Sequence, residues 1–600
     1  MADTKSSAED VSPIERVNKA DSAGTYFSEK KDALDQQSSH DKPTAEELVT
    51  LRRVASKIPL NIYSIAFIQL CERFSWYGTV IVYTNFIQMP MPEGSTTGAP
   101  LTRDGQPGVL GMGQQASTSI TLTNMAIGAC MPLLGAYIAD QHLGRYKTIC
   151  AALVVAILGH LVLVVAASPP VLAQGPSNAL GALITGMLTV SLGAGGFLPN
   201  ISPMIAEQID TEKGPRVTVL PKTGERVIED PAVTINRVYN WFYLFINIGA
   251  LVGQISMVYA EAYVGFWLSF LLPAIILCFC PSIMWWGRKR FKTRKPTGSA
   301  LSKALRTFLL ANKGRWHILP WVTYQRLNDG TFWENVKPSK FAPGTKPKWM
   351  TFDDAWVDEL QRGFAACQVF LWYPIYWLSY GQMNNNLISQ AATMKLDGVP
   401  NDLLTNLDPI TLIILIPIFD FVIYPFLRKH KINFTPLKKI TAGFLVGGAG
   451  MIWAAVVQNS IYSLSECGNM ASGTTATGDQ CPPATLSVWA QTGSYVLIAL
   501  SEILASITSL EYAFSKAPKN MRSTVQAIAM FMTAISSALA VAFVPLSTDP
   551  LLVWNYGSTA VIAIVGGALF WWVFRELDSK EGELNELPEG KLFADRDEED

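Results

Sequence analysis

Long apolar runs separated by short polar segments make up most of the chain between residues 60 and 575. A run of about 18 or more apolar residues can cross the hydrocarbon core of a bilayer as a helix, which pairs every backbone amide within the segment. The pattern therefore predicts an all-α polytopic membrane protein with about twelve transmembrane helices. We expect these spans near residues 60–88, 115–139, 147–168, 179–206, 237–261, 264–287, 363–389, 408–427, 438–462, 486–512, 523–546 and 551–575.

Composition fits this class. Apolar residues make up 49% of the chain and charged residues only 16%, whereas soluble proteins carry about a quarter charged residues. The sequence contains no phosphate-cradling glycine loop followed by lysine and no cluster with metal-ligand spacing, which argues against an ATP-driven pump and an intramembrane hydrolase. We therefore expect no enzyme, no cofactor, no metal and no nucleic-acid partner.

The predicted spans form two groups of six, which are separated by a charged segment. This layout is typical of two pseudo-symmetric bundles that rock about a site at the bilayer midplane. The predicted organisation is a disordered cytosolic N-terminal tail (1–56), a six-helix bundle (57–287), a cytosolic linker (288–361), a second six-helix bundle (362–576) and an acidic cytosolic tail (577–600).

Basic residues mark one side of the membrane. A run from Arg288 to Lys295 follows the sixth span, whereas the loop over 464–485 contains no Lys or Arg. The positive-inside rule therefore places both termini in the cytosol. Cys467 and Cys481 share the opposite, oxidising side, where they either form a disulfide or remain two free thiols.

Polar side chains in the first span share one helical face. Gln69, Glu72, Arg73, Trp76 and Tyr77 follow one another at i, i+3, i+4, i+7 and i+8. Ionisable groups at membrane depth almost always face a bundle interior or a wet cavity. This face is therefore a candidate solute site, although Glu72 and Arg73 could instead only neutralise each other for packing.

Other spans add candidate groups. Asn247 lies on a polar stripe of the fifth span, where an amide can also serve only as a bond between helices. Glu502 is a carboxylate within the tenth span that can bind an ammonium group or carry a proton. Trp377 and Gln382 in the seventh span suit a peptide-like ligand or simple packing, and Asp408 precedes Pro409 at the extracytosolic end of the eighth span, where solvent could suffice.

The loop between the second and third spans reads Gly-Ala-Tyr-Ile-Ala-Asp-Gln-His-Leu-Gly-Arg over 135–145. Asp140 and Arg145 can make charge-assisted bonds to helix ends, which would restrain a rocking bundle. This loop resembles the motif of the major facilitator superfamily, and we expect both residues to act in gating.

Three longer segments resemble the proton-dependent oligopeptide transporter family of that superfamily. Cys71–Gly78, Cys-Glu-Arg-Phe-Ser-Trp-Tyr-Gly, is similar to its helix-one signature, and Phe242–Gly249, Phe-Tyr-Leu-Phe-Ile-Asn-Ile-Gly, to its second. Ser501–Pro518 resembles the helix-ten region of its fungal members. The resemblance implies a major facilitator fold and proton-driven import of di- and tripeptides.

The resemblance also implies roles for individual residues. Arg73 would help to hold the peptide carboxylate, Asn247 and Glu502 would hold the amino end, and Tyr77 would line the pocket. A zwitterionic peptide needs a cation on one wall and a carboxylate on the other, and the two bundles offer one each.

The sequence departs from the family pattern at two positions that interact in other members. Gln69 stands where the family has a glutamate, and Leu198 where it has a lysine. When both charges of a buried ion pair are absent, no charge is left without a partner. If only one were absent, the other would remain buried and unpaired, at a cost of about 3–5 kcal/mol of stability. Because Gln69 cannot titrate, we expect Glu502 to carry the coupled proton, with Glu72 as the second candidate.

The sequence thus predicts a monomeric transporter in the plasma membrane, with the vacuolar membrane as an alternative. Its partners would be small peptides, protons and the lipid bilayer. Two other interpretations stay open. One is a family member with a different nitrogenous solute or without proton coupling, and the other is a peptide sensor that does not transport.

The predicted topology is testable with cysteine chemistry. After reduction of intact cells, an impermeant thiol reagent should modify Cys467 or Cys481, because their loop is expected outside the cytosol. Modification only after permeabilisation would invert the topology.

Overall fold

The computed structural model describes residues 43–579. Gaps within this range lie at 103–104, 210–213, 221–223, 294–295, 297–299, 316–325, 327–329, 343–345, 348, 432–433, 474–480, 510–511 and 513–521. Most of the expected N-terminal tail and nearly all of the acidic tail after residue 577 lie outside the described residues.

The first six predicted spans each coincide with a helix. These helices are α3 (Leu60–Gln88), α4 (Gly113–Ile138), α5 (Arg145–Ala166), α7 (Pro176–Ala206), α8 (Pro231–Tyr263) and α9 (Phe266–Gly287), with the short α6 (Pro169–Leu172) between α5 and α7. Nine helices within the described ranges are long and apolar enough to cross a membrane.

The later spans are less regular. They comprise α15 (Leu407–Ile418) and α16 (Tyr424–Lys429) joined by a π-helical turn, α17 (Pro436–Leu464), α18 (Thr492–Glu502), α20 (Arg522–Val541) and α21 (Leu552–Ser579). The predicted seventh span is broken into α12 (Asp354–Cys367), α13 (Tyr373–Tyr380) and α14 (Asn386–Ala392). Short 3-10 turns at Gln368–Trp372 and Gly381–Asn384 separate these pieces.

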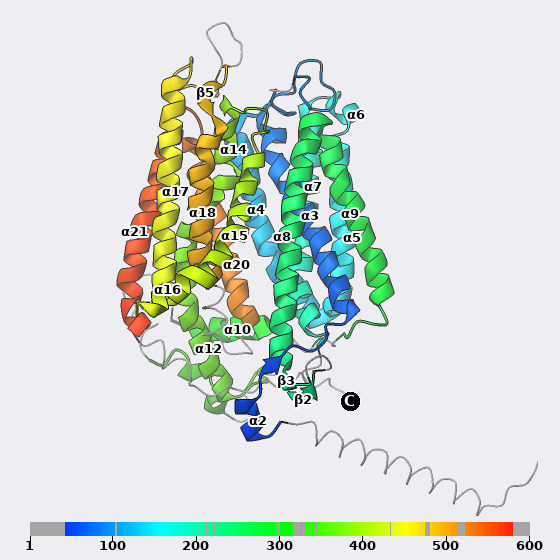
Figure 1. Cartoon of the computed structure of the whole chain (residues 1–600), viewed down its shortest axis with the longest axis vertical. Coiled ribbons are helices and arrows are strands. Elements are labelled where there is room, and N and C mark those ends of the chain that lie inside the picture. The colour runs from blue at the N-terminus through cyan, green and yellow to red at the C-terminus, as the bar shows by residue number, and fades with distance from the viewer. Residues whose placement is uncertain are drawn as a thin grey trace, which may run out of the picture. The chain divides into compact units, whose positions relative to one another are not determined.

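Backbone contacts divide the chain into two compact units. The larger holds Ser64–Met204 and Leu244–Asp600, and therefore most of both expected bundles. In Figure 1 its blue-to-green helices lie on one side and its yellow-to-red helices on the other. Helix α4 packs against α20, α5 against α9, and α17 against α21.

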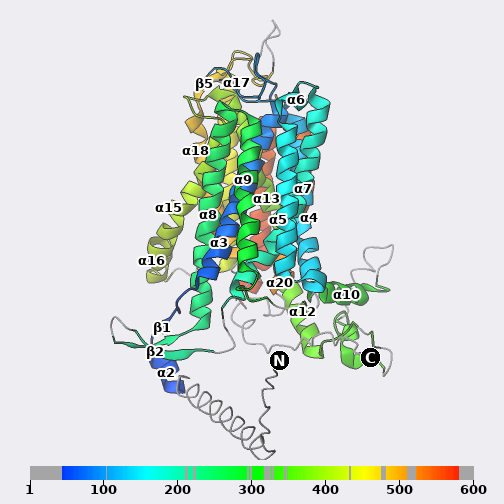
Figure 2. The same cartoon turned by 90° about the vertical axis from the view of Figure 1, so that its right-hand side faces the viewer.

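The two ends of the larger unit carry different segments. The strands β4 (Met394–Lys395) and β5 (Ala484–Ser487) pair in parallel, and β5 follows the loop in which Cys467 and Cys481 form a disulfide, with the sulfur atoms 2.06 Å apart. We call this the disulfide end. Helices α10 (Ala300–Asn312) and α12 lie at the opposite end in both views (Figures 1 and 2), which we call the linker end.

The linker has a small core of its own. Buried apolar side chains from α10, α12 and the segment between them pack together, and Trp356, Val357 and Leu360 of α12 are fully buried there. Both helices also contact α20. The linker is thus attached to a helix of the second bundle.

The smaller unit contains Met1–Tyr63 and Ile205–Tyr243. Its three-stranded sheet has the order β1 (Arg53–Val54), β3 (Arg226–Glu229), β2 (Arg216–Val219), with β1 parallel and β2 antiparallel to β3. Ion pairs Arg53–Asp230 and Arg52–Glu225, both 3.0 Å, and Arg226–Glu47, 2.7 Å, hold the N-terminal segment to the hairpin.

This sheet differs from the disordered tail expected up to residue 56. The described part of that tail includes α2 (Ala45–Thr50), which begins with a capping box at Thr44 and Glu47. The isolated sequence has too few apolar residues to order itself. Pairing with β3 supplies backbone partners from residues more than 170 positions later.

Two glycines of α8 set its distance from α3. A Cβ on Gly249 would lie 2.5 Å from the carbonyl oxygen of Leu70, and one on Gly253 would overlap the carbonyl oxygen of Phe74. Both contacts are with backbone, which cannot rotate away. The close approach positions the α3 turn that carries Glu72 and Arg73.

This packing predicts a stability difference between two glycine substitutions. Gly253→Ala should lower the free energy of unfolding by about 1–3 kcal/mol, because the added methyl overlaps a fixed carbonyl. Gly181→Ala in α7 is the matched control, since its methyl would meet nothing within 4 Å and alanine is the better helix former. Thermal unfolding in detergent measures both, and equal midpoints would contradict the prediction.

Candidate functional site

A buried ion pair on α3 forms the centre of the site. The Arg73 guanidinium donates from Nε and Nη2 to the two carboxylate oxygens of Glu72, both at 2.7 Å. Glu72 is 4% exposed and Arg73 7%. This two-pronged geometry is the strongest that the two side chains can form, and it lets both charges remain at membrane depth.

Tyr77 joins this pair to the second bundle. The Arg73 guanidinium carbon lies 5.4 Å from the centre of the Tyr77 ring, one helical turn further along α3. Tyr77 also interacts electrostatically with Glu502 of α18. A cation of the first bundle and a carboxyl of the second therefore share one neighbourhood.

Glu502 ends α18, immediately before a π-helical turn over Ile503–Ile507. Such turns often accompany functional sites, because they redirect a helix face. The Glu502 carboxyl interacts with Tyr380 and Asp408, and its buried Oε2 atom has no hydrogen-bond partner among the residues that the structure describes. It therefore has an acceptor position available for a donor from a ligand.

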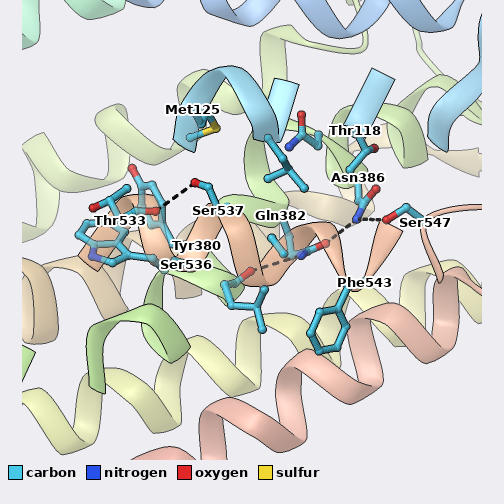
Figure 3. A pocket seen from close by; sticks show the side chains of 16 residues that line it. Thr118, Met125, Tyr380, Gln382, Asn386, Thr533, Ser536, Ser537, Phe543 and Ser547 are labelled. Atoms are coloured by element: carbon cyan, nitrogen blue, oxygen red, sulfur yellow. Dashed lines mark hydrogen bonds between the residues drawn. The ribbon is translucent and has the colours of Figure 1, made fainter. Parts of the chain in front are cut away.

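Two further aromatic side chains of the site come from α13. The rings of Trp377 and Tyr380 meet edge to face, with centroids 5.2 Å apart. Both line a cavity of about 100 Å³ between α4, α13 and α20. Figure 3 shows Met125 and Thr118 of α4 on one side of this cavity and Ser537 of α20 near it.

Gln382 lines the same cavity from the 3-10 turn after α13. Its Nε2 donates to the carbonyl of Leu378 at 3.3 Å, and its Oε1 accepts from Asn386 at 2.6 Å. Asn386 also donates to the Ser547 hydroxyl (Figure 3). Gln382 is therefore held by its own hydrogen bonds, at the edge of the aromatic wall.

Three other predicted residues lie as follows. Asp408 is 4% exposed in the first turn of α15, so the solvated helix end considered from the sequence is not its environment. Asn247 is half-buried on α8. Gln69 is buried on α3, and its Oε1 has no partner in the part of the chain that the structure describes.

The candidate gating residues are close but loosely joined. Asp140 lies in a π-helical turn (Ala139–Leu143) that Gly144 ends with a φ of 75°. The nearest nitrogen of Arg145 lies 4.0 Å from its carboxylate, and about a third of each side chain is exposed. Exposed pairs of this kind contribute about 0–1 kcal/mol, so this contact adds little to stability.

Sequence reasoning missed a network of neutral polar side chains between the two bundles at the disulfide end. The bonds join Asn85 to Asn401, Gln114 to Asn386, Thr121 to Asn385 and Gln88 to Ser389. The asparagine run at 384–386 within a predicted span was the available signal. These bonds close the site toward the disulfide end.

Sequence reasoning also missed two carboxyls in this network. Glu261 near the end of α8 and Asp402 before α15 are both fully buried. Their positions near the ends of hydrophobic runs suggested solvated loops, and only the docking of the bundles buries them.

Comparison with known proteins gives consistent matches. The family model described as PTR2: POT family matches residues 146–560. The chain is 39% identical to peptide transporter PTR_C of Candidozyma auris over 91% of this chain and 89% of the relative, and 37% identical to the probable peptide transporter ptr2 of Schizosaccharomyces pombe over 97% and 90%. The crystal structure of the POT family transporter PepTSo superposes with a TM-score of 0.64 at 21% identity, covering 88% of this chain and 99% of that one.

The buried pair predicts a large cost for removing one partner. Glu72→Gln should lower the free energy of unfolding by about 3–5 kcal/mol, because it leaves the Arg73 charge buried without a counter-charge. The double substitution Glu72→Gln with Arg73→Gln should cost less than the single one. Thermal unfolding in detergent measures both.

Glu225→Gln is the control for this experiment. Its partner Arg52 lies at the same kind of distance, 3.0 Å, but both side chains are well exposed, so its loss should cost less than about 1 kcal/mol. Similar losses for Glu72→Gln and Glu225→Gln would show that burial does not determine the strength of the α3 pair.

Proposed function

The chain belongs to the POT family of peptide transporters, and from this premise we propose that it imports di- and tripeptides by proton symport. The family predicted from the sequence is thereby confirmed, and so are the all-α polytopic major facilitator fold and a transporter rather than an enzyme. The protein is an integral membrane protein. The size of the peptide, the proton coupling and the roles of single residues are the proposal.

One observation carries the proposal. Arg73 lies over the Tyr77 ring, and Glu502 is within electrostatic range of the same side chain, so a cation and a carboxyl from opposite bundles act on one residue. A di- or tripeptide zwitterion has its own charges a few bonds apart and could bridge the two. Its carboxylate would exchange with Glu72 for the Arg73 guanidinium, and its ammonium group would bind Glu502.

The remaining site residues would recognise the rest of the peptide. Tyr77 would lie along its backbone, and Asn247 would assist at the amino end. Trp377 and Gln382 would offer an aromatic face and an amide to its side chains and peptide groups, and Asp408 would add a second carboxyl near Glu502. Asp140 and Arg145, in the loop between α4 and α5, would restrain the opening of the site toward the linker end.

Proton coupling would follow from the competition at Glu502. Within the described ranges its buried Oε2 has no hydrogen-bond partner, and the groups that interact with it electrostatically are tyrosines and Asp408. A protonated carboxyl would be stable there until a peptide ammonium group replaced the proton. Glu72 is the second candidate, because a peptide carboxylate that draws Arg73 away would leave it without its counter-charge.

Gln69 and Leu198 favour a second candidate function. With both family charges absent at these positions, the chain could move another nitrogenous solute or work without a proton, and a peptide sensor is the remaining alternative. Uptake by purified protein in liposomes, with and without a pH gradient, separates the three. We further propose a monomer in the plasma membrane, with both termini in the cytosol and the disulfide end outside.

Two substitutions test the proposed site. Arg73→Ala should lose uptake of unmodified dipeptides, because the peptide carboxylate would lie unpaired in a closed site at a cost of about 2–5 kcal/mol. Glu502→Gln should abolish accumulation driven by a pH gradient while sparing peptide exchange. Both are measured in liposomes with a radioactive dipeptide.

Glu93→Gln is the matched control, because Glu93 is an exposed carboxylate in the loop after α3 and should leave uptake unchanged. Wild-type uptake by Arg73→Ala would contradict the proposed binding mode. If Glu502→Gln still concentrates peptide under a pH gradient, Glu72 becomes the proton carrier.

A further inference from the structure

Four completely buried polar residues meet where the bundles close at the disulfide end. Asn85 and Glu261 come from α3 and α8 of the first bundle, and Asn401 and Asp402 come from the loop before α15. Asn85 is 1% exposed and the other three 0%. Two carboxyls thus lie in the same buried interface between the bundles.

The hydrogen-bond donors of this cluster are already used. The Asn85 amide donates to Glu261 Oε1 at 2.8 Å and to Asn401 Oδ1 at 3.0 Å. The Asn401 amide donates to Asn85 Oδ1 at 2.9 Å and to the Ile388 carbonyl at 3.3 Å. Each amide nitrogen carries two hydrogens, so neither has one left.

Three carboxyl oxygens therefore lack a donor. They are Glu261 Oε2 and both oxygens of Asp402, which are buried and accept no side-chain hydrogen bond from the residues that the structure describes. Among the described residues, the groups that interact with the two carboxyls are each other, Asn85, the backbone amide of Asp402, and Tyr495 of α18. None of these described groups is a base, so two full negative charges would have nothing to balance them.

A water-accessible hollow lies next to the pair. A cavity of about 400 Å³ is lined by Ala262 and Tyr263, which follow Glu261 in the chain, and by Val399 and Pro400, which precede Asn401. The loop after α3 forms another part of its wall. The cavity wall therefore includes the chain neighbours of Glu261 and residues two and three positions before Asp402, although the two carboxyls themselves are buried behind it.

We propose that Glu261 and Asp402 bind one proton between them when the bundles close at the disulfide end, making this a second proton site separate from Glu502. A shared proton supplies the missing donor and removes one of the two charges. A proton fits better than a metal ion, because the described residues contain no group of three or more acidic, histidine or cysteine ligands.

Burial raises the pKa of the Asp402 carboxyl to about 7. When the bundles separate, water reaches Asp402 and the pKa of its carboxyl returns toward its ordinary value near 4. Between about pH 4 and pH 7, the closed state thus holds a proton that the open state releases. Closure is favoured below this window and is lost as the pH rises through the higher value.

The proton enters from the disulfide end on closure and leaves to the same end on opening. It is therefore not the proton that crosses the membrane, and acid on that side would promote closure around a bound peptide. This role goes beyond the proposed symport. It rests on the proposed function only in assuming that peptide is carried from the disulfide end inward. For one linked proton, the closed-to-open ratio changes at most about tenfold per pH unit.

Distance measurements in the full chain test the proposal. Spin labels carried by noncanonical amino acids at Leu101 and Met470, both exposed at the disulfide end, report opening in lipid nanodiscs between pH 5 and 9. The wild type should shift toward the longer distance as the pH rises. The double substitution Glu261→Gln with Asp402→Asn should stay closed throughout, because neutral amides cannot ionise.

Asp397→Asn is the control, since Asp397 lies in the same loop but pairs with Lys395 at 3.0 Å on the surface. It should respond to pH as the wild type does. If the double variant does not fold, each single substitution serves, because one amide can donate the bond that a shared proton supplies and should flatten the response.

Three outcomes would overturn the proposal: no response of the wild type to pH, an unchanged response in the Glu261 and Asp402 variants, or opening controlled by Na⁺ at constant pH. Failure of the proposed symport is distinguishable. Wild-type protein that closes in acid but accumulates no peptide would refute symport and leave this site intact. Glu502→Gln should keep the pH-dependent distance change even though it loses accumulation.

Discussion

The Glu72–Arg73 pair places two full charges at membrane depth, each more than nine-tenths buried. Removing either charge from water costs several kcal/mol, and the mutual contact is the main interaction that offsets this. The pair is therefore stable only while both partners are present. A peptide carboxylate that competes for Arg73 would exchange one ion pair for another and leave Glu72 as the group that needs a proton or a donor.

The contact between bundles at the disulfide end is built on a different principle. Its bonds join neutral amides and hydroxyls, such as Asn85 with Asn401 and Thr121 with Asn385. Each such bond contributes about 0.5–1.5 kcal/mol net, because water replaces it when it breaks. A junction of this kind can open without stranding a charge, which a transporter that alternates between two states requires.

Carboxyls without a basic partner among the described residues occur at two places along the bundle interface. Glu502 and Asp408 interact near Tyr380, where a peptide would bind, and Glu261 and Asp402 meet at the closed junction. Two acids in one dry site cannot both be charged without a large cost. Under the proposed function, peptide binding and bundle closure would thus each be linked to a proton, although Gln69 and Leu198 carry no charge.

The sequence by itself determined the membrane class, the helical spans and the face of α3 that carries Glu72, Arg73 and Tyr77. These follow from runs and spacings that are local, and a helix converts local spacing into a shared face. Tertiary structure alone decided the break of the seventh span, the pairing of β1 with β3, and the burial of Asp408 and Asp402. The Asn85–Asn401 bond joins residues 316 positions apart. No local pattern encodes such contacts, because whether a polar group near the end of an apolar run meets water or another helix depends on how the two bundles dock.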